Sequence, residues 1–447
     1  MGGGLMQLVA YGAQDIYLTG NPQITFFKVV YRRHTNFAME NIQQTFSGNP
    51  SFGQRATAIV SRNGDLINSA YLQVQLPSLT AENWYFVNGT SPSPSPSGEY
   101  KLCWTNYVGL AIIQYVTVEI GGQEIDKHYG LWMYVWQELT MTSEKSQGYK
   151  RMVGGNDAAG WLLLGNADEP QDLHVPLDFW FNINAGLSLP LIALQYHEVR
   201  FVFQFQDLKN LVVLIDSNGD HVPVTEWAIK SASVQAPLIE LFIDYIYLDT
   251  DERRRFAQMS HEYLIEQVQH NETSVDLTKA GVNTHRLTFN HPCKEIIWLF
   301  QRNDNLENND YFNFANSPPG TEKLGSDLLT AAVLRLNGHY RFNPARGPLF
   351  FRQWQPFIHH TRIPDSNLYL YSFALRPEEH QPSGTCNFSR IDNTILEFSL
   401  DTRSQVSSPV VPDLQFSNGG AALMTVYARN YNVLRIMSGM GGLAYSN

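Results

Sequence analysis

Two glutamates beside a tight turn are the first residues of this chain whose types and spacing could do chemistry. Glu119 and Glu124 flank the Gly-Gly turn of a predicted hairpin, and glycoside hydrolases work with two carboxylates. Such a pair has to lie about 5–9 Å apart across an open cleft. A similar hairpin later in the chain carries Arg335 and Tyr340 at the matching positions. We therefore do not expect a glycosidase site at these two glutamates.

Two histidine motifs resemble metal sites but lack part of the ligand set. His261-Glu262 begins like a zinc protease motif, without a second His three residues after the Glu. His359 and His360 are adjacent, so on a strand their side chains point to opposite faces and cannot bind one ion together. We predict a hydrogen-bonded structural role for these histidines and expect no metal.

Known ligand-binding loops are also incomplete or missing. Residues 216–220 resemble the start of a calcium loop, but the sixth position is His221 rather than Gly and the twelfth is Trp227 rather than Glu. No Gly-x-Ser-x-Gly elbow, Walker loop or dinucleotide fingerprint is present. The sequence therefore predicts no enzyme and no cofactor.

The elements that carry these residues occur twice. Residues 116–122 and 332–338 alternate apolar with other side chains and end in Gly-Gly or Asn-Gly, the strongest short-range signal for a β-hairpin. The halves also end alike, since Arg255-Phe256 follows Ile246-Tyr247 at the spacing at which Arg435-Ile436 follows Val426-Tyr427. A duplicated β unit favours a structural building block, because symmetry serves assembly more readily than a single active site.

Short strand-like segments separated by long loops fill both halves. They lie at 58–60, 70–74, 173–181, 198–206, 238–248, 285–290, 295–301, 367–374, 393–400 and 422–429. This pattern is typical of antiparallel β-sandwiches or jelly rolls. We predict that the chain reverses at residues 62–65, between the first two of these segments. Residues 88–99 are rich in Pro and Ser and are predicted to form an exposed loop.

Helices are few. Leu131, Trp132, Val135, Trp136 and Leu139 recur at helical spacing, which predicts a short amphipathic helix packed on a sheet. A second helix is predicted to start at Asp249, near a domain boundary at 245–270, with acidic residues at its N-terminal end. Residues 1–36 show no clear period and are predicted to be an irregular arm.

The composition suggests a surface that other subunits cover. The chain has 447 residues, enough for two domains, with 43% hydrophobic and 13% aromatic residues. Charged residues make up only 16%, well below the roughly 25% of ordinary domains. Few charges and many aromatic residues indicate subunit contacts, and two well-packed β domains with polar uncharged loops remain the alternative.

Charge and cysteine content restrict the partners and the compartment. A net charge of −11 argues against direct nucleic-acid binding, and the cluster at 253–255 is interpreted as a solvated helix end or a subunit contact. Cys103, Cys293 and Cys386 are odd in number and far apart, which fits a reducing compartment such as the cytoplasm. No secretory signal, myristoylation motif or membrane span is predicted.

Three candidate modification sites have the Asn-x-Ser/Thr pattern for glycosylation. They are Asn88, at the start of the Pro/Ser-rich loop, Asn271 and Asn387. Only the position of Asn88 independently indicates an exposed site. Each pattern could also arise by chance in a chain this rich in asparagine.

Four long blocks resemble a known family. Residues 3–33 (GGLMQLVAYGAQDIYLTGNPQITFFKVVYRR) resemble the start of the major capsid protein of nucleocytoplasmic large DNA viruses, the algal-virus type in particular. Further similar blocks are 189–198 (LPLIALQYHE), 381–390 (QPSGTCNFSR) and 430–445 (NYNVLRIMSGMGGLAY). They cover both halves in the family's order, whereas the loops 77–103, 140–172 and 302–328 follow no family pattern. Asn387 lies within a matching block, which favours a structural role for it.

This resemblance implies an all-β fold of two consecutive eight-stranded antiparallel jelly-roll barrels with short helices in the loops. The expected parts are an N-terminal arm at 1–36, a first jelly roll at 37–250 and a second at 251–447. Three chains are expected to form a pseudo-hexagonal capsomer, and many such homotrimers to tile an icosahedral shell around an internal membrane and DNA. Loops such as 88–99 would then form the outer towers, and the arm would lie near the inner base.

The resemblance also implies partners and a location. Neighbouring capsomers, minor capsid proteins and penton proteins are the expected partners, in the outer capsid of a virion assembled in the host cytoplasm. Family members are often glycosylated, partly outside the usual Asn pattern. Two alternatives stay open, namely a scaffolding or minor capsid protein with the same double-barrel fold and a carbohydrate-active jelly-roll protein.

Overall fold

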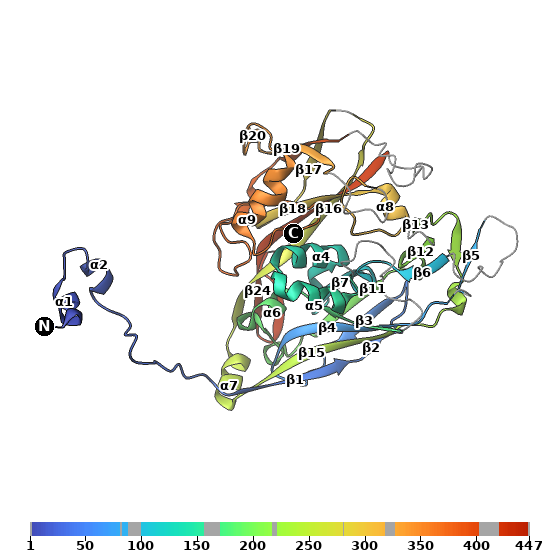
Figure 1. Ribbon diagram of the computed structural model, residues 1–447. Helices are drawn as coiled ribbons and strands as arrows, with labels where there is room; N and C mark the ends of the chain where they lie inside the picture. Colours follow the sequence, from blue (N-terminus) through green and yellow to red (C-terminus); the bar gives the residue numbers. More distant parts are fainter. Residues whose placement is uncertain are drawn as a thin grey trace. The chain divides into compact units, whose positions relative to one another are not determined.

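The computed structural model describes residues 2–80, 83–87, 100–155, 170–216, 221–279, 281–317, 327–401 and 420–445 (Figure 1). The chain divides into two compact units, Met1–Phe37 and Ala38–Asn447. The first contains helices α1 (Gly3–Val9) and α2 (Ile16–Thr19), neither of which buries a side chain. These helices correct the prediction of an arm without regular structure. No described helix is long and apolar enough to cross a membrane.

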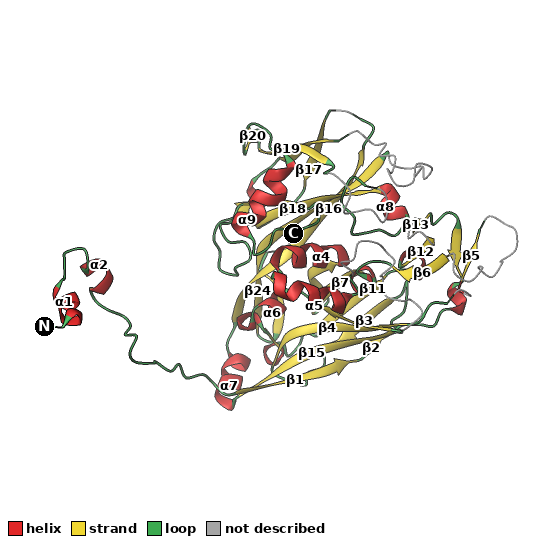
Figure 2. Cartoon of the chain, viewed as in Figure 1, coloured by secondary structure: helices red, strands yellow, loops and turns green. Residues whose placement is uncertain are grey.

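Antiparallel sheets account for most of the regular secondary structure in the described part of the second unit (Figure 2). The first half has two five-stranded sheets, with strand orders β1-β15-β4-β10, where β9 also pairs with β4, and β2-β3-β11-β7-β8. Their strands are β1 (Phe37–Gln44), β2 (Phe46–Ser47), β3 (Arg55–Ile59), β4 (Leu66–Leu76), β7 (Ile113–Ile120), β8 (Gln123–Tyr129), β9 (Gln171–Pro176), β10 (Leu189–Pro190), β11 (Val199–Phe205) and β15 (Leu238–Leu248). Two smaller sheets, β13-β12-β6 and β14-β5, contain β5 (Trp84–Phe86), β6 (Tyr100–Trp104), β12 (Val212–Asp216), β13 (His221–Val222) and β14 (Trp227–Ile229).

The second half has a six-stranded and a four-stranded sheet. The larger has the order β16-β24-β18-β21, with β22 on β18 and β25 on β24, and the smaller is β17-β23-β19-β20. Their strands are β16 (His261–Asp276), β17 (Val282–Leu287), β18 (Pro292–Arg302), β19 (Leu329–Leu336), β20 (His339–Tyr340), β21 (Tyr369–Ser372), β22 (Cys386–Asn387), β23 (Thr394–Leu400), β24 (Ala421–Met437) and β25 (Met440–Leu443). The strand predicted over 173–181 is too long, since β9 ends at Pro176 and a helix begins at Trp180.

Alternation explains which sheet faces are buried. On β15, Ile239, Leu241, Ile243 and Tyr245 are buried and alternate with more exposed residues. Successive side chains of a strand point to opposite faces, so one face of this sheet covers the core and the other lies at the surface.

Both predicted hairpins are confirmed. Ile120 pairs with Gln123 across the Gly121-Gly122 turn, and Leu336 pairs with His339 across Asn337-Gly338. All four turn residues have a positive φ. Two consecutive positive φ angles define the turn that matches the twist of a two-residue hairpin, which is why Gly-Gly and Asn-Gly stand there.

The turn predicted at residues 62–65 does not close a hairpin. β3 and β4, on either side of it, lie in different sheets, so this segment is a crossover, and a reversal of the chain there stays a prediction. Gly64 is required by close packing rather than by a turn, because a Cβ atom there would lie 2.9 Å from the Tyr245 Cβ. Asp65 holds the crossover in place by accepting a hydrogen bond from the Leu248 amide.

Short helices lie in the connections between strands. They are α3 (Val108–Ala111), α4 (Gly130–Thr140), α5 (Ser143–Val153), α6 (Trp180–Ile183), α7 (Thr250–Gln258), α8 (Asn303–Glu307) and α9 (Gln355–His359), which continues a π-helical turn, η8 (Phe350–Trp354). Isolated 3₁₀ turns are η3 (Ala185–Leu187), η4 (Leu191–Ala193), η5 (Leu208–Asn210), η6 (Ser231–Ser233) and η9 (Phe388–Arg390). The helix predicted from Asp249 is confirmed, and the Asp249 side chain caps it by accepting from the Thr250 amide.

The predicted helix at 131–139 is confirmed as α4, but it is not amphipathic. Met133 and Tyr134 are buried as well as Trp132 and Trp136. The second half explains this burial, because the ring of Phe312 lies 4.7 Å from that of Tyr134. α4 is therefore enclosed between the two halves.

The apolar core is continuous across the halves. The larger cluster of buried residues contains the first-half sheets and α4, together with second-half residues such as Ile265, Ile297 and Tyr427. A second cluster lies within the second half around Trp298 and Phe300. The two halves thus share a packed interface.

Candidate functional site

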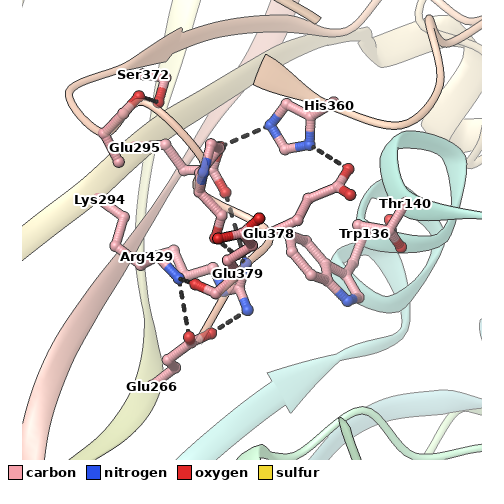
Figure 3. A network of polar contacts seen from close by, with 12 residues as sticks. Trp136, Thr140, Glu266, Lys294, Glu295, His360, Ser372, Glu378, Glu379 and Arg429 are labelled. Atoms are coloured by element: carbon pink, nitrogen blue, oxygen red, sulfur yellow. Dashed lines mark hydrogen bonds and ion pairs between the residues drawn. The ribbon is translucent and has the colours of Figure 1, made fainter. Parts of the chain in front are cut away.

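A cluster of buried charged side chains lies where α4 meets the large sheet of the second half (Figure 3). We call it the ionic seam and define it by Glu266, Lys294, Glu295, His360, Glu378 and Arg429, with Trp136. Glu266 lies on β16, Lys294 and Glu295 lie on β18, and Arg429 lies on β24. His360 directly follows α9, and Trp136 is supplied by α4.

Glu266 is the centre of the ionic seam. Its carboxylate accepts from Lys294 Nζ at 2.8 Å and from the Arg429 guanidinium. His380 Nδ1 lies 3.7 Å from the same carboxylate. Burial raises the pKa of Glu266, but the surrounding cations, Arg429 first, outweigh burial and lower it to about 2. Glu266 is therefore ionised at every physiological pH.

Lys294 is a cation removed completely from solvent, with an exposed fraction of 0%. Its ammonium donates to Glu266 and to the Glu379 carbonyl at 2.9 Å, and it lies 4.9 Å from the centre of the Tyr431 ring. Burial, together with the charge of Arg429, lowers the pKa of Lys294 to about 8. The carboxylate of Glu266 keeps this lysine charged at neutral pH.

His360 joins two carboxylates. Its Nε2 lies 2.8 Å from Glu295 Oε2, and its Nδ1 lies 3.0 Å from Glu378 Oε1. Burial lowers the pKa of His360, but the two carboxylates outweigh burial and raise it to about 9. The pKa of Glu295 is lowered, since His360 and Arg429 overcome the opposing effect of its burial. His360 is therefore an imidazolium that donates from both nitrogens.

Arg429 connects the two halves. Its guanidinium lies 3.7 Å from the centre of the Trp136 ring, on α4 of the first half, and Nη1 donates to the Pro377 carbonyl at 3.1 Å. A planar guanidinium can stack flat on an indole while its edge bonds to a carboxylate. This contact fixes α4 against β24.

Further polar contacts extend the junction on both sides of Trp136. Arg362 lies 3.5 Å from Glu138 at the end of α4, and its backbone amide donates to the Leu139 carbonyl. Asp178 accepts from Gln137 at 2.7 Å, and burial raises the pKa of this carboxylate to about 6. Hydrogen bonds and ion pairs thus accompany the apolar packing at this junction.

The charged groups of the ionic seam are paired with one another. Each of its carboxylates is held by a cation, and Lys294, Glu295 and Arg429 are buried. Glu119 and Glu124 are cross-strand neighbours on the β7–β8 hairpin and do not contribute to it. Across the described ranges, no group of three or more His, Cys, Asp or Glu side chains could hold a metal ion.

The histidines singled out in the sequence have the predicted hydrogen-bonded roles. His261 Nε2 bonds to the Phe256 carbonyl at 2.8 Å, and His359 Nδ1 bonds to the Leu375 carbonyl at 3.0 Å. Glu262 forms an exposed ion pair with Arg435. The pair His359-His360 lies at the end of α9 and not on a strand.

The candidate glycosylation sites lie in different surroundings. Asn271, on β16, donates to Thr288 at 2.9 Å and bonds to His285 at 2.7 Å, so its amide is already engaged. Asn387 is exposed, and its side chain accepts from the Ser389 amide at 3.0 Å. Asn88 lies outside the described residues, as do the loop 88–99 and residues 217–220 of the calcium-like segment.

Sequence reasoning did not single out Glu266, Lys294, Glu295 or Arg429. One signal was available, since Lys294-Glu295 interrupts a strand in which almost every residue is buried. Buried charges have to be paired, so two adjacent charges in such a strand require partners elsewhere in the fold. The sequence does not indicate which residues those partners are.

Comparisons with known proteins identify the family. Residues 25–249 match the family described as major capsid protein N-terminus, and residues 252–442 match the large eukaryotic DNA virus major capsid protein family. A major capsid protein of Pyramimonas orientalis virus is 45% identical over 471 residues, with 100% of both chains covered.

Solved structures agree with this assignment. The crystal structure of VP54 of PBCV-1 is 37% identical, with a TM-score of 0.77 over 95% of this chain and 100% of that chain. A quasi-atomic structure of the PBCV-1 virus capsid matches at 36% identity with the same TM-score and coverage. The predicted all-β double jelly roll is confirmed, whereas eight strands per barrel stays a prediction. The chain belongs to the major capsid proteins of large eukaryotic DNA viruses, and its role is that of a structural protein of the capsid.

Proposed function

We propose that three copies of this chain form a capsomer of pseudo-hexagonal outline and that such homotrimers tile an icosahedral shell. The observation that carries the proposal is the whole-length similarity to a protein of the PBCV-1 virus capsid. Two jelly rolls per chain give six similar barrels per trimer. A ring of six barrels can meet six neighbouring capsomers although the assembly has only threefold symmetry.

The ionic seam has a role in this assembly. A tile with six equal sides requires that the two barrels of each chain keep a fixed relative orientation. Apolar packing alone is not directional, whereas charge-assisted hydrogen bonds fix distance and angle. Arg362 supplies such a hydrogen bond between the halves, because its Nη1 donates to Ser146 Oγ on α5 at 2.9 Å. The stacking of Arg429 on Trp136 and the ion pair of Arg362 with Glu138 add further directional contacts.

The proposed parts of the chain are an arm at 1–36, a first jelly roll at 37–250 and a second at 251–447. The two family matches, which end at 249 and begin at 252, support a boundary near 250. Helix α7 starts at Thr250 and leads from β15 into β16. The connection between the two jelly rolls is thus proposed to be α7.

The proposed partners are neighbouring capsomers, minor capsid proteins and penton proteins, close to an internal viral membrane. The proposed location is the outer capsid of a virion that assembles in the host cytoplasm. The net charge of −11 supports a protein that does not bind the genome directly. Glu266 and Glu295 are buried and paired with cations, which supports a chain without enzymatic activity.

Glycosylation remains proposed at Asn88, Asn271 and Asn387. Exposure favours Asn387, although its side chain also caps a 3₁₀ turn. The amide of Asn271 would have to leave Thr288 and His285 before modification. Peptide mapping of protein purified from virions would identify the modified residues directly.

Size-exclusion chromatography with light scattering tests the proposed assembly. We expect particles of three chain masses at micromolar concentration, and a monodisperse monomer would contradict the proposal. Protein abundance in purified particles, measured by mass spectrometry, separates a major shell protein from a scaffolding or minor capsid protein. A major shell protein has to dominate the particle.

A further inference from the structure

The helix formed by η8 and α9 has an apolar outer side. On its inner side Phe351 is buried, with its ring 5.0 Å from that of Trp298. On its outer side Trp354, Phe357 and Ile358 are 53%, 67% and 49% exposed. The Trp354 and Phe357 rings are stacked at 6.2 Å, so they form one surface.

The spacing of these three residues is that of a helix stripe made for burial. Positions i, i+3 and i+4 lie on one face of a helix, and an apolar stripe of this kind normally faces a core. Here the opposite face already contacts the core, through Phe351 and Gln355. The outer stripe is therefore a second apolar face that the single chain does not cover.

Neighbouring residues enlarge this face. Leu349, Ile363 and Leu375 are 67%, 41% and 73% exposed, and His359 at the end of α9 bonds to the Leu375 carbonyl. We call the set of Leu349, Trp354, Phe357, Ile358, Ile363 and Leu375 the α9 face. Phe357 and Ile363 also line a groove of about 810 Å³ whose other wall is α5. Large exposed apolar patches of this kind mark interaction sites.

Arginines flank the α9 face. Between Leu328 and Pro364 the chain has five arginines and no Asp, Glu or Lys. Arg335, Arg352 and Arg362 pair with Glu397, Asp327 and Asp365, so Arg341 and Arg346 carry the positive charge next to the face. Arg341 and Arg346 are exposed, and the Arg346 guanidinium lies 5.7 Å from the Phe350 ring. Trp, Phe and Arg with few Lys, Asp or Glu is the composition that marks the centre of protein–protein interfaces.

An acidic counterpart lies on the first half of the same chain. The outer face of β1 and β15 carries the apolar side chains of Met39 and Leu238, which are 51% and 55% exposed. Glu240 and Asp244 stand between them on that face, bonded to Gln43 and Asn41. Neither strand contains Lys or Arg. The negative charge of the β1–β15 face thus complements the arginines at the α9 face, and its exposed apolar side chains can pack against those of the α9 face.

We propose that the α9 face of one copy docks on the β1–β15 face of a second copy. This pair of faces forms the contact between neighbouring subunits of the capsomer. The inference rests on the proposed trimer and adds the surfaces that form it. A contact between two different surfaces is heterologous, and three such contacts close a ring. The second half of each chain then meets the first half of the next.

A double substitution tests the contact in the full-length chain. Trp354→Glu with Phe357→Glu places two charges in the centre of the proposed interface, and we expect association at least about 100-fold weaker, as for loss of an interface hot spot. Mass photometry over a dilution series measures the fractions of monomer and trimer, and from them the strength of association. Val282→Glu is the matched control, because Val282 is 66% exposed on β17 outside the α9 face. The control should assemble like the wild type.

The outcomes separate this inference from the proposed trimer. A wild-type chain that stays monomeric overturns the trimer itself. A wild-type trimer together with a double variant that assembles equally well overturns only the contact proposed here. The circular dichroism spectrum and the thermal unfolding of the monomer should be the same for the double variant and the wild type, because both side chains are exposed in the single chain. Unfolding of the variant monomer would contradict that premise.

Photo-crosslinking identifies what lies on the α9 face. A benzoylphenylalanine at position 357 of the purified chain should capture peptides from β1 or β15 of another copy. Capture of any other segment overturns the proposed pairing. Vesicles of phosphatidylcholine and phosphatidylserine that bind the wild type, but not the double variant, while both remain trimeric would assign the face to lipid instead. Charge reversal at Glu240 and Asp244 should weaken association in parallel with reversal at Arg341 and Arg346.

Discussion

Replacing Glu266 by Gln should cost the fold much more than the same replacement at Glu262. Both glutamates lie on β16, and each pairs with an arginine of β24, namely Arg429 for Glu266 and Arg435 for Glu262. Glu266 is 8% exposed, whereas the side chains of Glu262 and Arg435 are 59% and 50% exposed. Chemistry, strand and partner type are matched, so burial is the main variable.

The expected magnitude follows from two independent arguments. The pKa of Glu266 falls from 4.5 to about 2 in the folded chain, which corresponds to about 3 kcal/mol of stabilisation of the ionised form. Removing one partner of a buried ion pair costs about 3–5 kcal/mol, because the remaining charge stays buried without compensation. Gln keeps the shape but leaves Lys294 and Arg429 uncompensated. For the exposed pair of Glu262 the expected loss is only about 0–1 kcal/mol.

Urea unfolding at pH 7, at one protein concentration for all variants, measures the difference in the free energy of unfolding. The reasoning predicts a loss of about 3 kcal/mol for Glu266→Gln and a much smaller one for Glu262→Gln. Equal losses for the two variants would refute the idea that the ionic seam stabilises the fold through buried charge. Tryptophan fluorescence should report the change early, since Trp136 stacks on Arg429.

Three further substitutions have defined outcomes. The pKa of His360, raised from 6.5 to about 9, gives a stabilisation that is complete below pH 6.5 and lost as the pH rises through 9, worth about 3 kcal/mol. Denaturation curves of His360→Gln should lack this dependence, and an unchanged slope between pH 6.5 and 9 would contradict it. The pKa of Asp178, raised from 3.8 to about 6, predicts that Asp178→Asn gains about 3 kcal/mol at pH 8 and nothing at pH 3. A loss at pH 8 would count against burial as the cause. Trp136→Leu should lower the free energy of unfolding by about 3 kcal/mol, because the cation–π contact is lost and a cavity is left. The control Trp354→Leu should leave the stability of the monomer nearly unchanged. Similar losses for the two variants would show that the Arg429 contact is unimportant.

Local signals predicted the elements that depend on local geometry. Gly121-Gly122 and Asn337-Gly338 were recognisable as hairpin turns because few other residue pairs accept two positive φ angles. Asp249 was recognisable as a helix start because its side chain satisfies an amide of the helix it precedes. In both cases the cause and its effect lie within a few residues of each other.

Local pattern was insufficient where a distant segment decided the outcome. The segment at 62–65 has the composition of a turn, but Tyr245 and Leu248 on β15 determine its path as a crossover. α4 has the spacing of an amphipathic helix, but the second half also covers its outer side, where the Tyr134 ring lies 4.7 Å from that of Phe312. Tertiary contacts overrode local pattern in both places.

The sequence by itself determined the fold class, the duplicated hairpins and, through four long blocks, the family. Only the tertiary structure showed that Glu266, Lys294 and Arg429 meet, and that Arg429 reaches Trp136 in the other half. The physical reason is the distance along the chain over which each kind of interaction acts. Turn and helix preferences act between neighbours in the chain, whereas the partners of a buried charge are chosen by which strands the fold brings together.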